Sequence, residues 1–194
     1  MNRHAMRRYV AIFLGVVAVY GLCTYDAYKT YYDYRQLCVR DGGLQLFQKV
    51  ERNVGWSAED LNVAKGYQRL LKDLAFVRAP NANGEMVDVT YKGVGVWGAD
   101  ASYNMPGADF SKPVRYHINV TTQQEKESSR IHKGIVTVTD LKTGKVAYQW
   151  NQYSFYWRHT DQPIRSLLVP SGVIRCPRSD TLPNFNEINA RTYK

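Results

Sequence analysis

Proline is absent from residues 1–79, although the 194-residue chain contains seven prolines. Because proline breaks a helix interior, long helices belong to this first part, and strands and loops are favoured from Pro80 onward. Acidic residues are absent before Asp26, and only one stretch is long and apolar enough to cross a bilayer. The scarcity of such stretches excludes a multi-pass membrane protein.

Signatures of catalysis are also missing from the chain. It contains no G-x-S-x-G, P-loop or dinucleotide fingerprint. A closed zinc site needs four ligands, so we interpret His117 and His132 as solvated strand residues that could at most meet across a hairpin. Glu59 and Asp60 are interpreted as helix-cap residues. We therefore expect no catalytic residue, no metal and no cofactor, and we keep an enzyme of unrecognised activity as a third hypothesis.

The apolar stretch runs from Tyr9 to Tyr25 and contains no charged residue. As a helix it is about 26 Å long, close to the roughly 30 Å of a bilayer's hydrocarbon layer. Arg7 and Arg8 precede it, which predicts a cytoplasmic amino terminus over residues 1–8. The stretch is thus interpreted as a transmembrane signal-anchor over residues 9–25.

Two alternatives to a retained anchor stay open. A cleaved signal peptide would leave a secreted or periplasmic protein, but Gly21, Leu22 and Cys23 make a poor cleavage site, and Leu22 does not suit lipoprotein processing at Cys23. A buried core helix of a cytosolic protein is weakened by the basic residues before the stretch and by its lack of a polar face. The anchor and the signal peptide both export the rest of the chain.

Export determines which cysteines are expected to form a disulfide. Of the three, Cys23 lies at the end of the apolar stretch, which leaves Cys38 and Cys176 in the exported part. Two thiols in an oxidising compartment pair by default, so we expect a Cys38–Cys176 disulfide, with two free buried cysteines as the alternative.

Periodicity predicts an α+β fold. The apolar helix continues beyond Tyr25, a second helix begins near Ser57 and runs up to Phe76, and a short strand covers residues 44–50. Two-residue alternation predicts strands over residues 86–96, 114–122, 130–140 and 146–157. We expect a helical part packed on a four- to five-stranded antiparallel meander within a domain of residues 26–183, with an edge strand at 167–174 and a flexible tail at 184–194.

A glycine pair follows the predicted first helix. Cys38 is followed by Asp41, Gly42 and Gly43, and we interpret the last three as a helix-stop turn that lets the chain enter a strand. An apolar leader, a tyrosine-rich segment and this Cys-x-x-Asp-Gly-Gly box follow one another along the chain. In this order of features the chain resembles a set of small bacterial envelope proteins of uncharacterised function. The resemblance covers about residues 1 to 50, implies a bacterial inner membrane with the domain in the periplasm, and implies no activity.

Aromatic residues are abundant, with 15 tyrosines and four tryptophans. Those between Tyr25 and Tyr34 fit the interfacial belt of a membrane. A second run is rich in the residue types that anchor protein interfaces, although burial in the sheet core explains it as well. The candidate partner surface comprises Trp150, Tyr153, Tyr156, Trp157 and Arg158.

Net charge widens the choice of partners. The chain carries 26 basic and 17 acidic residues, a surplus that is spread along it. Our first hypothesis is a non-enzymatic, membrane-anchored protein that binds an envelope protein as an accessory subunit or an immunity-type inhibitor. The alternative is a module for an anionic glycan or lipid. We expect no nucleic acid, because of the compartment, and no small-molecule ligand.

Overall fold

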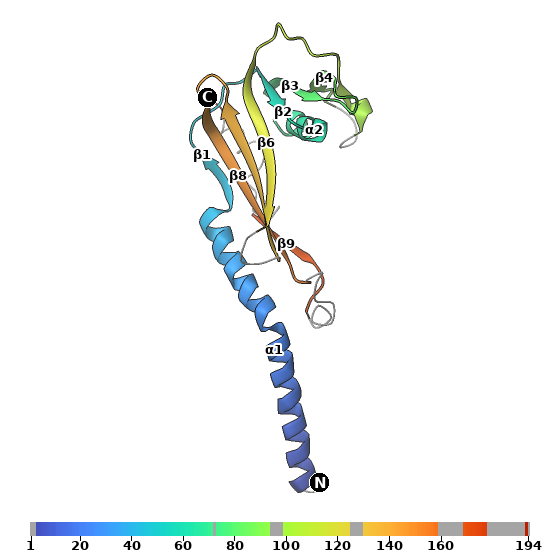
Figure 1. Ribbon diagram of the computed structural model, residues 1–194, viewed down its shortest axis with the longest axis vertical. Coiled ribbons are helices and arrows are strands. Elements are labelled where there is room, and N and C mark those ends of the chain that lie inside the picture. The colour runs from blue at the N-terminus through green and yellow to red at the C-terminus, as the bar shows by residue number, and fades with distance from the viewer. Residues whose placement is uncertain are drawn as a thin grey trace. The chain divides into compact units, whose positions relative to one another are not determined.

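The computed structural model describes residues 3–71, 73–93, 99–124, 130–158, 169–177 and 193 (Figure 1). Its elements in chain order are α1 (Arg3–Asp41), β1 (Gly43–Leu46), β2 (Val54–Ala58), α2 (Leu61–Leu70), β3 (Leu74–Pro80), β4 (Met86–Tyr91), the 3-10 helix η1 (Asp100–Ser102), β5 (Tyr103–Asn104), β6 (Val114–Gln124), β7 (Ile131–Asp140), β8 (Lys145–Tyr156) and β9 (Val173–Cys176). The α+β class is as expected.

The sheet is mixed and larger than the four- to five-stranded antiparallel meander expected from the sequence. Its nine described strands are ordered β1-β8-β7-β6-β2-β3-β4-β5, and β9 pairs with β8. The consecutive strands β6, β7 and β8 are neighbours, in line with the meander, but β2 runs parallel to both β3 and β6. Parallel neighbours require a crossover, which α2 supplies between β2 and β3.

The second helix is shorter than its periodicity predicts. Asp60, rather than Ser57, is its N-cap, and the Asp60 carboxylate accepts hydrogen bonds from the N–H groups of Asn62 and Val63. The helix ends at Leu70, and the predicted continuation to Phe76 is instead strand β3. Pairing of β3 with β2 and β4 satisfies its backbone on both sides, and this outweighs the helical spacing of Leu71 and Leu74.

Two compact units divide the chain. Unit 1 comprises Met1–Gly42, Gln123–Lys133 and Gln152–Pro177, and unit 2 comprises Gly43–Thr122, Gly134–Asn151 and Arg178–Lys194. Within unit 2, α2 lies against β2 and β3 (Figure 1). Trp56 of β2 is fully buried there and packs on Tyr67 of α2, while Phe76 and Arg78 alternate with the core residue Val77 and lie on the opposite face of β3.

Three sequence expectations concern the later part of the chain. The edge strand predicted over residues 167–174 corresponds to β9, which begins at Val173, whereas residues 167 and 168 lie outside the described part. A flexible tail does not hold for Tyr193, which is buried in unit 2 and bridges to Val50. The other residues of 184–194 lie outside the described part, as do residues 94–96 of the strand predicted at 86–96.

Candidate functional site

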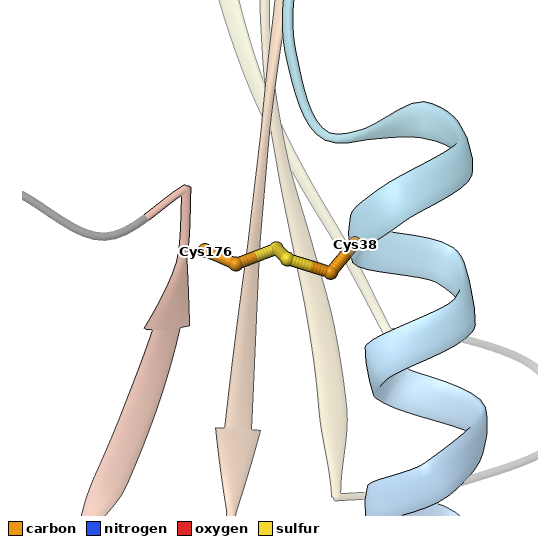
Figure 2. Close-up of a disulfide and its surroundings, with 2 residues drawn as sticks. All are labelled: Cys38 and Cys176. Carbon is orange, nitrogen blue, oxygen red and sulfur yellow. A yellow bond between two sulfur atoms is a disulfide. The ribbon is translucent and has the colours of Figure 1, made fainter. Parts of the chain in front are cut away.

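The end of α1 is held by a disulfide between Cys38 and Cys176, which confirms the predicted pairing (Figure 2). The two Cα atoms are 5.9 Å apart across 138 residues of chain. The Gly42 N–H donates to the carbonyl oxygen of Cys38, and Gly43 adopts a φ of +99°, so the chain leaves the helix at the predicted turn. A Cβ at Gly42 would lie 2.5 Å from the Cys38 oxygen, so only glycine fits beside the disulfide.

An aromatic cluster joins α1 to β8 within unit 1. Tyr31 packs on Phe155 and Trp157 with ring centroids 5.4 and 5.0 Å away, and Tyr34 packs on Phe155 at 5.5 Å. Tyr28 meets Trp157 edge to face at 5.6 Å. The tyrosines expected to form one interfacial belt therefore divide between this cluster, where Tyr34 is buried, and an exposed set. The exposed set is Tyr25 and Tyr32, and Tyr28 is 48% exposed although its ring contacts the cluster.

The predicted partner surface, which runs from Trp150 in β8 to Arg158 just beyond it, is divided in a similar way. Tyr153 is 1% exposed and belongs to the core of unit 1, so its assignment to a surface is wrong. Alternation along the strand explains this, because Tyr153, Phe155 and Trp157 face α1 and Tyr156 faces away. Tyr156 and Arg158 are exposed, Trp157 is half-buried, and Trp150 is half-buried in unit 2.

Arg130, immediately before β7, contacts the turn of α1 that contains Asp26. Its guanidinium donates to the Trp157 carbonyl oxygen, and its Nε lies 3.4 Å from a carboxylate oxygen of Asp26. The Arg130 side chain is buried, whereas the Asp26 side chain is largely exposed. Buried arginine requires such partners, because desolvating an unpaired charge costs several kcal/mol.

Unit 2 contains a pocket of about 750 Å³ at the amino ends of β2, β3 and β6. Gly55 leaves room for the Phe76 ring, and both residues line the pocket. A Cβ on Gly55 would lie 2.2 Å from Cζ of Phe76. The pairing register of β2 shifts at Gly55, and such irregularities often lie beside functional sites. The lining residues are Glu51, Asn53, Val54, Gly55, Ala75, Phe76, Lys112, Pro113, Val114, Arg115, Leu141 and Lys142.

Charges of both signs border this pocket. Arg115 lies 2.8 Å from a carboxylate oxygen of Asp140 and 3.6 Å from one of Glu51. Burial alone would raise the pKa of Asp140, but the N–H groups of Lys142 and Thr143 and the charge of Arg115 hold that pKa below its usual value. Arg115 is thus fixed by its own acids, and the exposed Lys142 is left as a cation at the rim.

A second polar group lies in unit 2 on neighbouring strands. Ser57 Oγ is 2.9 Å from His117 Nδ1, and His117 Nε2 is 3.7 Å from a carboxylate oxygen of Glu59. This order of side chains is the one used for nucleophilic catalysis. However, Ser57 Oγ can also donate to the Tyr116 carbonyl oxygen at 3.5 Å, so the hydroxyl bridges two strands. We interpret the group as a structural tie.

His132 packs edge to face on Tyr156 in unit 1. Among the residues that the structure describes, no cluster of three histidine, cysteine, aspartate or glutamate side chains is placed to hold a metal ion. His117 therefore has a hydrogen-bonding role and His132 has a packing role.

The sequence did not reveal Arg115, Glu51 or Asp140 as a group, because they come from three separate segments. A signal was present in the polar positions of an alternating strand, where Arg115 precedes the buried Tyr116. No protein-family model matches the chain, and no curated protein or solved structure matches it. The site is consequently interpreted from its chemistry alone.

Proposed function

We propose that this chain is a single-pass membrane protein whose exported domain binds another protein of the cell envelope, without enzymatic activity. The observation that carries the anchoring is the exposure of an apolar helix surface. Leu14, Val16 and Leu22 are each at least 60% exposed, and α1 is the one described helix long and apolar enough to cross a membrane. Lipid is the solvent that stabilises such a surface.

The proposed topology places the amino terminus in the cytoplasm and the domain in the periplasm. It is supported by the basic residues before Tyr9 and by the disulfide, since disulfides persist on the oxidising side of a membrane. A cleaved leader would also deliver the domain there. Retention is favoured because α1 continues unbroken from the apolar segment to Cys38, so cleavage would cut through a folded helix.

The proposed binding site is the pocket of unit 2. Its walls are apolar at Phe76, Val114 and Leu141, and Leu141 is 52% exposed at the rim beside the exposed Lys142. An apolar side chain next to a carboxylate matches this pair of features, because burial and charge attraction act together. The ligand we propose is therefore an acidic and apolar segment of a partner protein.

The test begins with a photocrosslinking amino acid in place of Leu141 in cells, which identifies the neighbour of the pocket. Purified partner is then titrated against the full chain in detergent. We expect Leu141→Asp to weaken binding about tenfold or more, because hot-spot apolar contacts contribute at least ~1.4 kcal/mol. Lys142→Glu should slow association, and Lys145→Glu, an exposed control outside the pocket, should change nothing.

Unchanged affinity for a folded Leu141→Asp variant would remove the pocket as the binding site. Folding is checked independently by retention of the Cys38–Cys176 disulfide and by the unfolding midpoint. Equal losses for Lys142→Glu and Lys145→Glu would point to nonspecific charge attraction and would contradict the site as well.

A further inference from the structure

The packing of unit 1 begins in the last turn of the apolar segment. Tyr20 is 45% exposed, whereas Thr24, one turn further along the same face of α1, is 3% exposed and Ala27 is 1% exposed. The protein therefore covers one face of α1 from Thr24 onward. Over most of the preceding apolar residues, every face of the helix is exposed. No length of bare helix separates the membrane segment from the folded unit.

The rise of the helix places Tyr28 in the headgroup layer and Tyr31 just beyond it. Tyr28 lies three residues beyond Tyr25, or about 4.5 Å along the axis, and Tyr31 lies about 9 Å beyond it. The headgroup layer on each side of a bilayer is about 5 to 7 Å thick. Trp157 contacts both tyrosines, so it lies between their two depths, in the outer part of this layer.

The length of the apolar segment strengthens this placement. Seventeen residues span about 26 Å, a few ångströms less than the hydrocarbon layer. A short segment is accommodated by local thinning and by drawing its flanking residues toward the bilayer. Beyond Asp26 and Ala27, the flanking aromatic residues are Tyr28 and the Trp157 that contacts it, and both side chains favour the interface.

Exposed side chains at this end of unit 1 have the matching chemistry. Tyr156 and Val173 are paired across β8 and β9 and are both partly exposed, and Arg158 is exposed immediately after Trp157. The Asp26 carboxylate, whose charge is opposite to that of Arg158, lies against Arg130. Figure 1 shows this end of β8 and β9 near the middle of α1, within the same unit.

We propose that Tyr28, Trp157 and Arg158 form a lipid-docking surface that lies among the phospholipid headgroups of the membrane holding α1. The rings occupy the interface, and Arg158 pairs with headgroup phosphates. Docking fixes unit 1 against the bilayer through two contacts, the helix and the end of the sheet, and this restrains rotation of unit 1 about the helix axis. The inference rests on the membrane anchoring proposed above.

Tryptophan fluorescence in vesicles tests the docking. The full chain is reconstituted in phosphatidylcholine and phosphatidylglycerol containing lipids brominated either near the headgroup or near the chain end. We expect Trp157 to be quenched more by the former, so that Trp157→Phe removes the quenched component. In the Trp157→Phe background, Tyr28→Trp restores that quenching, whereas Val39→Trp, about 21 Å beyond Tyr25, stays unquenched.

Leu14→Trp in the same background separates the two proposals. Quenching of this tryptophan by chain-end bromine, with no quenching of Trp157 in the wild-type chain, would retain the anchor and overturn the docking. Absence of quenching at both positions would overturn the anchor and the docking with it. Arg158→Glu should reduce quenching of Trp157, and Arg35→Glu, an exposed control further along α1, should not. Equal effects of the two charge reversals would contradict a phosphate contact at Arg158.

Discussion

Tyr20 is 45% exposed and Thr24, four residues later on the same face of one continuous helix, is 3% exposed. This change marks the point at which unit 1 begins to cover one face of α1. Before it, apolar side chains are exposed around the helix. After it, one face packs on the aromatic core of unit 1.

A charge in the apolar segment should therefore weaken membrane retention. Val17 lies at the centre of residues 9–25, and an arginine at the centre of a spanning helix costs about 2.5 to 3.5 kcal/mol on the insertion scale. We expect Val17→Arg to move chain from the membrane fraction to the soluble fraction or to degradation. Val39→Arg, at an exposed position outside the segment, should leave the distribution unchanged. Equal behaviour of the two variants would contradict the anchor.

Loss of the disulfide should destabilise unit 1. Closing so long a loop contributes up to about 4 to 5 kcal/mol in the chain-entropy model. We expect Cys38→Ser with Cys176→Ser to lower the unfolding midpoint in denaturant and Cys23→Ser, at the remaining thiol, to have little effect. Peptide mapping without reductant should recover Cys38 joined to Cys176 in the wild-type chain. A midpoint that does not move on removing the pair would count against this role.

Acid should weaken the fold partly through Asp140. Its pKa is lowered in the folded state, so the group contributes stability above its unfolded value, near pH 4, and loses that contribution as the pH falls below it. We expect the free energy of unfolding, measured in denaturant between pH 3 and pH 7, to fall at the acid end. Asp140→Asn should flatten this part of the profile. A profile equally steep in both proteins would refute the assignment to Asp140.

The close approach of Phe76 to Gly55 predicts an overpacked variant. Gly55→Ala places a methyl group where the ring lies, and overpacking of this kind costs about 1 to 3 kcal/mol. Gly107→Ala is the matched control, because nothing lies within 4 Å of the added atom. Adding Phe76→Leu to Gly55→Ala should recover part of the loss in a double-mutant cycle. Additive costs in that cycle would show that the ring and the glycine are not coupled.

Local patterns account for the parts of the fold that were predicted correctly. The chain reversal after Asp140 uses a carboxylate that accepts from two following N–H groups and a glycine at positive φ, all visible in the sequence. The first helix was predicted from an uninterrupted apolar run. The disulfide was predicted from the number and positions of the cysteines. Each of these signals can be read from a short segment of sequence or from the type of residue present.

Long-range pairing accounts for the parts that were missed. Strand β2 reads Val-Gly-Trp-Ser-Ala, without alternation, and becomes a strand because β3 and β6 bond to it on both sides. Parallel pairing leaves no hairpin signal in the sequence. The same reason hid the pocket, whose charged residues approach only after these strands assemble. The burial of Tyr153 was missed because a run of aromatic residues does not reveal which face a helix will cover.

The central claim is that α1 is retained in a membrane and carries the folded units outside it. Intact mass measurement of the protein in the pellet after alkaline carbonate extraction of cell membranes tests this most directly. We predict the full 22.3 kDa chain in the pellet, with Cys38 and Cys176 oxidised. Recovery in the supernatant, of either the full chain or a form shortened by the apolar segment, would contradict the account.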